Sequence, residues 1–279
     1  MKRARAAGVA ALAVGLAATL HASPARAAFE LRDASPAALG GVSIDLESES
    51  MFEAARLHRG GLRLGASHSA LYQVEGLAQE RAWIGGGWRW GSISITYSRV
   101  GVAGAAESCA RVAIQESRAS AVELELDAER LDLSIDGEAR EGGMTLGGAA
   151  RARASFPRFD LEVGVAADRI LQSRGLDRLS VTPSVPIAVR LRSGSAAVGW
   201  VDRWGGDGRR SPRLVLDLPL GGSARLRLGR GEAPGRTGAA LAVRLRAMEV
   251  SAGRMDQSSG EVITGFAVGL VTARAGGGR

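Results

Sequence analysis

Alternation of apolar and polar residues is plainest in the stretch Gly91-Ser92-Ile93-Ser94-Ile95-Thr96-Tyr97-Ser98. Side chains of a β-strand point alternately to the two faces of a sheet. The two isoleucines and the tyrosine therefore share one face, and the serines and threonine share the other. A helix would mix these two sets. The stretch predicts a β-strand that buries one face in an apolar environment.

The same alternation recurs through most of residues 62–272. Glycine, at 39 of 279 residues, gathers in short clusters between the alternating stretches, which is typical of turns between strands. The apolar sets that we assign to single faces include Leu62/Leu64/Ala66/His68/Ala70/Tyr72, Phe159/Leu161/Val163, Ile187/Val189/Leu191, Leu226/Leu228, Leu241/Val243/Leu245 and Met248/Val250. We predict an all-β chain of roughly 12–14 antiparallel strands that run up and down in sequence order.

One irregularity is expected within this pattern. Over residues 122–126 the apolar residues stand at even positions, whereas over residues 131–135 they stand at odd positions. A change of phase is typical of a β-bulge or a turn. We therefore expect the chain to bulge or turn near Glu129 and Arg130.

The first 27 residues have the features of a cleavable export signal. Lys2 and Arg3 precede an apolar run over residues 6–20, and Ala25-Arg26-Ala27 supplies small residues for cleavage before Ala28. The apolar run is shorter than the ~20 residues that a membrane-spanning helix needs. Removing the four basic residues of the signal lowers the formal charge from +7 to +3. A nucleic-acid partner is therefore not expected.

Export and alternation together favour a membrane barrel. Segments of ~10 alternating residues separated by turns are typical of transmembrane β-barrels, whose apolar side chains face lipid and whose polar side chains face the lumen. We expect residues 59–279 to form such a barrel, surrounded by outer-membrane lipid of a Gram-negative cell. The alternative is a soluble periplasmic or surface β-sandwich that serves as a binding or structural module. It is kept because aromatic residues make up only 4% of the chain and residues 274–279 contain none.

The start of the mature chain adds a resemblance. Residues 32–43 are mostly small and contain Gly40-Gly41, residues 45–50 are acidic, and Leu57 precedes the first alternating stretch at residues 62–72. In these features the chain resembles the FadL/PorV-type outer-membrane β-barrel family, although the Asn-Pro pair of that family is missing.

The resemblance implies a transport role or an accessory role in secretion. The partner would then be a small hydrophobic solute or a component of a secretion system. It also implies that residues 28–58 form a plug inside the barrel.

Charged residues on the polar faces are candidates for lining the lumen. They are Arg190, Arg192, Arg225, Arg227, Arg244, Arg246, Glu123, Glu125 and Asp127. The arginine pairs could give the lumen an anion preference, as rings of charge do in pores, or they could pair with the acids. The acids could hold calcium or form a solvated wall. We favour mutual pairing and a solvated wall.

The sequence predicts no catalytic residue, no cofactor and no metal site. The mature chain contains His58, His68 and Cys109 as its only histidines and cysteine, too few for a zinc site of the usual kinds. It contains no Gly-x-Ser-x-Gly nucleophile motif, no Walker motif and no dinucleotide motif. An enzyme housed in a barrel is the remaining alternative, and would need a histidine to meet a serine or aspartate at one rim. We expect His68 to pack on the apolar face of its strand.

Overall fold

The computed structural model describes residues 38–39, 61–88, 91–102, 104–116, 122–135, 141–173, 183–194, 196–205, 210–232 and 235–272. The predicted signal peptide and most of the 28–58 segment, with His58, lie outside the described residues. Fourteen strands are present: β1 Leu62–Ala70, β2 Ala78–Trp88, β3 Gly91–Val102, β4 Ala105–Glu116, β5 Val122–Ile135, β6 Glu141–Ser155, β7 Asp160–Gln172, β8 Ser184–Ser193, β9 Ala196–Gly205, β10 Arg213–Pro219, β11 Ala224–Glu232, β12 Gly235–Leu245, β13 Met248–Gln257 and β14 Val262–Val271.

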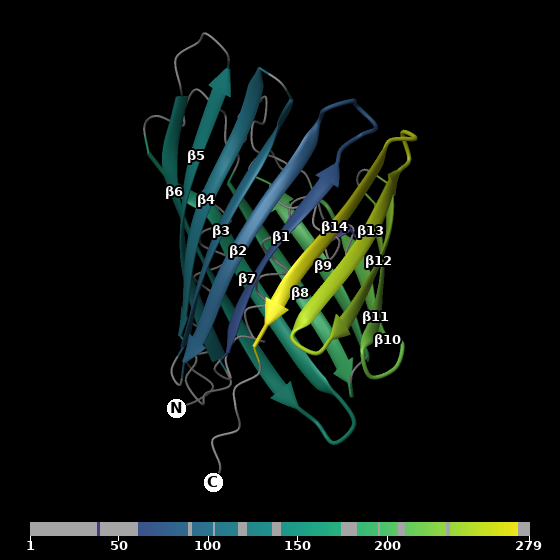
Figure 1. The fold of residues 1–279 in the computed structure, drawn as a ribbon. Coiled ribbons are helices and arrows are strands. Elements are labelled where there is room, and N and C mark those ends of the chain that lie inside the picture. The colour runs from purple at the N-terminus through teal and green to yellow at the C-terminus, as the bar shows by residue number, and fades with distance from the viewer. Residues whose placement is uncertain are drawn as a thin grey trace.

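The strands close into one antiparallel barrel in which each strand pairs with its neighbours in sequence (Figure 1). The last strand pairs with the first, from Arg63 opposite Val271 to Ala70 opposite Thr264. Closure leaves no unpaired strand edge. The prediction of an up-and-down all-β barrel is confirmed, with fourteen strands. Two separate packed sheets, as in the sandwich alternative, are excluded by this closed pairing.

The irregularity predicted near Glu129 and Arg130 is wrong. Strand β5 runs without interruption, and its register with β4 and β6 is continuous. Leu131 points into the barrel and is 0% exposed, while Arg130 lies on the outside, where its Nε contacts Asp132 Oδ2 at 3.0 Å. Along β5 the inward face changes from charged to apolar, and the outward face changes from apolar to charged. The alternation therefore changes phase although the strand is regular.

The bulge lies in β7 instead. The pairing of β6 with β7 shifts between Leu146 and Gly148, so that residues 168–170 stand opposite Gly147. Arg169 has a backbone φ of 54°, in the left-handed region that residues other than glycine rarely adopt. As a result both Asp168 and Arg169 are buried. Neighbouring residues of a regular strand would point to opposite faces.

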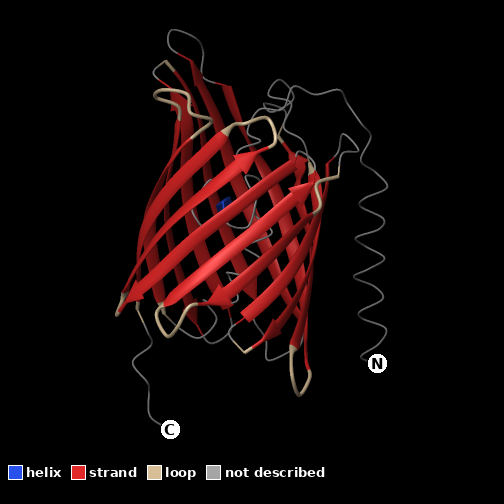
Figure 2. Ribbon diagram, turned by 90° about the vertical axis from the view of Figure 1, so that its right-hand side faces the viewer, coloured by secondary structure: helices blue, strands red, loops and turns tan. Residues whose placement is uncertain are grey.

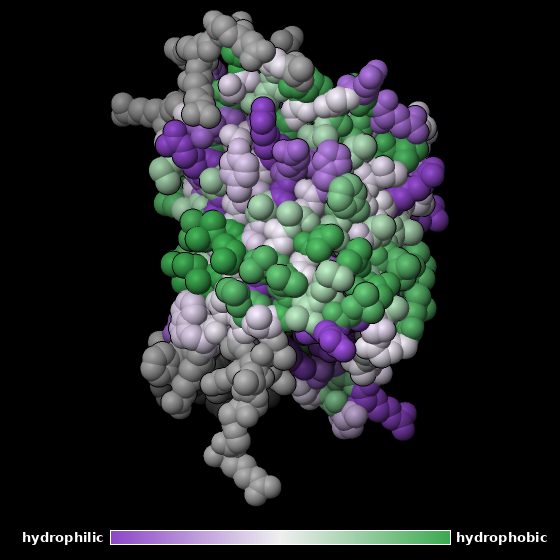
Figure 3. Space-filling model, in the orientation of Figure 1, coloured by the Kyte–Doolittle hydropathy of each residue, from purple (hydrophilic) through white to green (hydrophobic). Residues whose placement is uncertain are grey.

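The outer face of the barrel is apolar over a broad belt. Figure 3 shows hydrophobic residues across the middle of the barrel and more polar ones above. Large apolar side chains exposed on the outside of the barrel include Ile95, Leu126, Leu214, Leu241 and Phe266. His68 lies on this face too, with its ring centroid 5.6 Å from that of Phe266, as the alternation predicts. Among the described residues, no helix is long and apolar enough to cross a membrane.

The two ends of the barrel differ in their connections. Strand β1 begins and β14 finishes at one end, which we call the terminal end (Figure 1). The three longest connections, residues 71–77, 173–183 and 206–212, all lie at the opposite end, which we call the loop end. The connections at the terminal end are two to five residues long.

Candidate functional site: the inward face of the barrel

Strand register decides which of the predicted lumen residues point inward. Glu123, Glu125, Asp127, Arg190, Arg192, Arg225, Arg227 and Arg244 all occupy the face opposite the exposed apolar side chains. Arg246 does not. It lies in the turn between β12 and β13 with a φ of 57°, and its carbonyl accepts a hydrogen bond from Arg244 Nε at 3.2 Å. Its even position continued the alternation of β12, but that strand ends at Leu245.

Strands β4 to β7 form an acidic wall. Its inward-facing acids are Glu107, Glu123, Glu125, Asp127, Glu129, Glu141, Asp160, Glu162 and Asp168. Its inward-facing arginines are Arg111, Arg151, Arg153 and Arg169. Acids are therefore about twice as frequent as arginines on this wall.

The arginines of the acidic wall are placed between its acids. Arg111 Nη2 lies 3.1 Å from Glu125 Oε1 and 3.3 Å from Asp127 Oδ2. Arg151, on the other side of β5, forms an ion pair with Glu123. Buried charges are stable only when they are paired and hydrogen-bonded. These contacts therefore hold β4, β5 and β6 together from the inside.

The bulge of β7 completes this network. Arg169 Nε contacts Glu129 Oε2 at 2.7 Å, and the two side chains are 4% and 2% exposed. The hydroxyl of Thr145 donates to the same carboxylate oxygen at 3.4 Å. Without the bulge, Arg169 would point away from the lumen and Glu129 would lose this partner.

Strands β8 to β12 form an arginine wall. Its inward-facing arginines are Arg190, Arg192, Arg203, Arg213, Arg225, Arg227, Arg236 and Arg244. Asp217 is the one acid that faces inward on the described residues of these strands. Glu162 lies at the boundary between the two walls, in register with both Arg153 and Arg190.

Asp217 is the centre of the arginine wall. Its Oδ2 lies 3.3 Å from Arg190 Nη2 and 3.3 Å from Arg227 Nη2, and its Oδ1 lies 3.2 Å from Arg225 Nε. Asp217 is 3% exposed, whereas the side chain of Arg225 remains 32% exposed. One carboxylate thus orients three guanidinium groups from β8 and β11.

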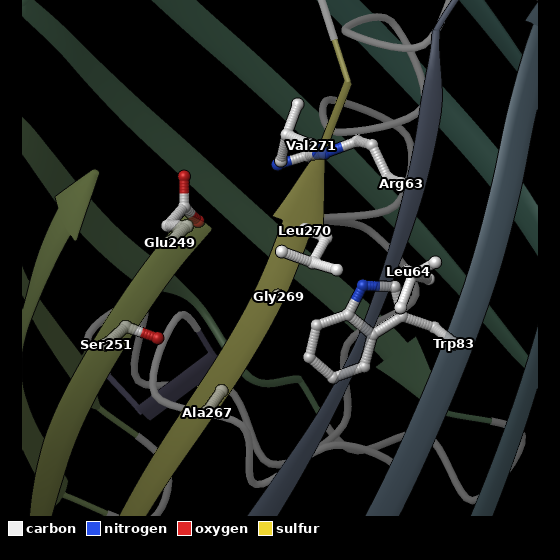
Figure 4. Close-up of a pocket in the computed structure, with 9 residues that line it drawn as sticks. All are labelled: Arg63, Leu64, Trp83, Glu249, Ser251, Ala267, Gly269, Leu270 and Val271. Atoms are coloured by element: carbon white, nitrogen blue, oxygen red, sulfur yellow. The ribbon is translucent and has the colours of Figure 1, made fainter. Parts of the chain in front are cut away.

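The remaining strands, β1–β3, β13 and β14, form a third wall, on which small residues are frequent. Residues that face inward there include Gly65, Ser67, Gly253, Ala267 and Gly269. Figure 4 shows Trp83 reaching from β2 toward β1 and β14, where Gly65 and Gly269 leave room for its indole ring. Arg63, Glu249 and Ser251 surround the same small pocket near the terminal end.

Leu39 packs on this small-residue wall near the loop end. It is 0% exposed and belongs to one cluster with Leu71, Met255 and Ile263, which are equally buried. Met255 and Ile263 are paired residues on the inward faces of β13 and β14. The helical piece Ala38–Leu39, blue in Figure 2, thus lies inside the barrel.

Sequence reasoning found part of these walls. It missed Arg111, Glu129, Arg151, Arg169 and Asp217. Alternation in Leu216-Asp217-Leu218 and in Ala150-Arg151-Ala152 could have placed Asp217 and Arg151 inside, but nothing in the local pattern marks the bulge that turns Arg169 inward. Among the described residues, no group of three or more histidines, cysteines or acids could hold a metal ion.

Comparison with known proteins gives a likeness of shape and no family. No family model matches the chain, and no curated protein matches it. Similar solved structures include a mutant of Rh. blastica porin, at 12% identity and a TM-score of 0.42, over 76% of this chain and 99% of that one. Another is the Acinetobacter baumannii outer membrane protein Omp33, at 8% identity and a TM-score of 0.49, over 76% and 98%. The FadL/PorV resemblance therefore stays a prediction.

Proposed function

We propose that this chain spans the outer membrane as a β-barrel and passes small water-soluble solutes. The observation that carries the proposal is the contrast between its two faces. Large apolar side chains are exposed around the outside, whereas charged side chains line the inside. Soluble proteins rarely expose apolar patches of this extent. A closed barrel also satisfies every strand without water, which a bilayer requires.

The ends of the barrel suggest its orientation. Outer-membrane barrels have short turns on the periplasmic side and longer loops outside the cell. The terminal end, whose connections are two to five residues long, would then face the periplasm. The loop end, with connections 71–77, 173–183 and 206–212, would face the exterior.

The lumen chemistry favours hydrated solutes over hydrophobic ones. Both walls present charged side chains to the lumen. A hydrophobic solute would have to displace water from these side chains, which costs free energy. The hydrophobic solute and the secretion component that the family resemblance implies remain predictions.

We also infer that residues 28–58 narrow the lumen as a plug. Leu39 is buried inside the loop end, whereas Gly61 lies at the terminal end, where its carbonyl accepts a hydrogen bond from Gly87 N at 3.2 Å. Residues 40–60 join these two points, which lie at opposite ends of the barrel. A route along the outside would expose unpaired backbone to lipid, so the lumen is the favourable route.

Two measurements test these proposals. Expressed in a Gram-negative host, the full chain should fractionate with the outer membrane and change its gel mobility on boiling; a protein released without detergent would contradict the membrane barrel. In liposomes, the chain lacking residues 29–57 should keep heat-modifiable mobility and admit small sugars faster than the full chain. Equal rates for the two folded chains would contradict the plug.

A further inference from the structure

We propose that three arginines on the outside of the loop end, Arg130, Arg210 and Arg254, bind the phosphate groups of lipid headgroups in the outer leaflet of the membrane. The proposal rests on the proposed function for the orientation of the barrel. It goes beyond that function by naming a partner for the outer surface, where no solute passes.

The outward faces of β5, β9 and β13 change from apolar to charged toward the loop end. Nearer the terminal end the exposed residues on these faces are Leu124 and Leu126 on β5, Val198 and Trp200 on β9, and Met248 and Val250 on β13. Toward the loop end they are followed by Arg130 and Asp132 on β5, Asp202 on β9, and Arg254 and Asp256 on β13. The more polar zone above the hydrophobic middle in Figure 3 lies at this end. A charged side chain in hydrocarbon is costly, so the change marks the level at which hydrocarbon ends and headgroups begin.

In each of the three ion pairs of this zone, arginine is the more exposed partner. The side-chain exposures of arginine and aspartate are 62% and 16% for Arg130–Asp132, 54% and 1% for Arg210–Asp202, and 62% and 46% for Arg254–Asp256. Each pair is neutral as a whole, but its carboxylate is the more covered group. A molecule beside the barrel at this level therefore meets guanidinium groups first.

The aspartates occupy only one edge of each guanidinium. Arg130 donates to Asp132 from Nε at 3.0 Å and from Nη2 at 3.2 Å. Arg254 donates to Asp256 in the same way, from Nε at 3.0 Å and from Nη2 at 2.7 Å. Because the five N–H donors of a guanidinium form a planar fork, Nη1 and the second hydrogen of Nη2 make another edge that points away from the aspartate. Two parallel donors of this kind match two oxygens of a phosphate.

Arg210 lies beside an aromatic ring that is typical of a membrane interface. It follows β9, where it forms an isolated bridge with Trp204. Its Nε donates to Asp202 Oδ2 at 2.9 Å, and its Cζ lies 4.8 Å from the centroid of the Trp204 ring. Trp204 is itself 46% exposed. Tryptophan is enriched where hydrocarbon meets water, and a guanidinium over its face is attracted to the ring. The ring thus helps to hold Arg210 at the level of the headgroups.

The test compares the binding of two lipids to the purified full chain in detergent by native mass spectrometry. Dioleoyl phosphatidic acid is the probe, and dioleoylglycerol is the same lipid without its phosphate. The unchanged chain should bind phosphatidic acid at least about tenfold more tightly than dioleoylglycerol, because only phosphatidic acid accepts charge-assisted hydrogen bonds. The variant R130Q/R210Q/R254Q should lose about that factor for phosphatidic acid. Its affinity for dioleoylglycerol should not change.

The matched control removes the same number of charges from the inward face. In R153Q/R192Q/R244Q all three substituted arginines point into the barrel, so the affinity for phosphatidic acid should equal that of the unchanged chain. Equal weakening in this control would overturn the proposal. Displacement of the lipid by an equal concentration of inorganic phosphate would overturn it too, because the site would then favour a free anion over a headgroup.

A lysine variant keeps the proposal testable if the glutamine variant fails to fold. R130K/R210K/R254K keeps the three charges without the planar fork and should still weaken the binding of phosphatidic acid severalfold. Unchanged affinity in the folded variants, or equal binding of the two lipids by the unchanged chain, would contradict the assignment. Lipid binding in detergent is measured apart from membrane fractionation and solute passage, so failure of the proposed function in those assays would leave this result standing.

Discussion

The acidic wall on β4–β7 and the arginine wall on β8–β12 use the same kinds of residue to different effect. In the acidic wall, arginines stand between acids, and the contacts Arg111–Glu125 and Arg169–Glu129 are largely shielded from solvent. On the described residues of the arginine wall, eight inward-facing arginines accompany one inward-facing acid, Asp217, which contacts three of them. The two walls therefore differ in the ratio of their charges: acids outnumber arginines on the first, and arginines outnumber acids on the second.

The largest expected effect removes one partner of the most deeply buried pair in the acidic wall. R169M would remove from the buried carboxylate of Glu129 the guanidinium that contacts it at 2.7 Å, and we expect the free energy of unfolding to fall by about 3–5 kcal/mol. Urea titration of the barrel refolded in lipid vesicles measures this change. The double variant E129Q/R169M should recover most of the loss, and a single-variant effect below about 1 kcal/mol would show that the pair contributes little.

A smaller effect is expected in the wall of small residues, which carries few charges. In G65L the new side chain would overlap the indole of Trp83, and its Cβ would lie 2.7 Å from the carbonyl oxygen of Val268. Overpacking of this kind costs about 1–3 kcal/mol. The same urea titration measures the cost, with G222L as the control because a Cβ at Gly222 meets nothing within 4 Å. Equal stability of the two variants would contradict the close fit around Trp83.

Charge reversal separates the two walls by ion selectivity. We expect the unchanged barrel in a planar bilayer to prefer chloride over potassium, and R225E/R227E to lower that preference by roughly a factor of ten. Reversal potentials in a potassium chloride gradient give the ratio. E125Q, on the acidic wall, should leave it nearly unchanged. A larger shift from E125Q than from R225E/R227E would reverse the roles that we assign to the walls.

The smallest effect should come from a pair outside the barrel. Arg130 and Asp132 lie 3.0 Å apart, and the Arg130 side chain is largely exposed. Exposed pairs contribute little, because solvent screens them. R130A should therefore change the free energy of unfolding far less than R169M does, and a comparable loss would mean that burial is not what distinguishes the two pairs.

Alternation predicted the strands and their faces because each strand carries apolar side chains on one face and polar side chains on the other. It succeeded for the outward-facing Leu226 and Leu228 and for the inward-facing Arg225 and Arg227. It failed at Leu131, where the apolar side chain faces the lumen, because period alone does not say which face is inside. It also failed at Arg169, whose inward position depends on a bulge in its pairing with β6. Alternation places Asp217 inside, but it does not show the contact with Arg190, which reaches across β9.

The seam between β1 and β14 makes the order of assembly matter. Hydrogen bonds such as that from Leu62 N to Thr272 Oγ1, at 2.9 Å, join residues 210 positions apart. Contacts between such distant residues form slowly, because a long loop must close before they can contribute. Strand β1 therefore stays unpaired on one side until β14 pairs with it. A chain that ends before Val262 would keep two open edges, β1 and β13, and would be prone to pair with other chains instead of with itself.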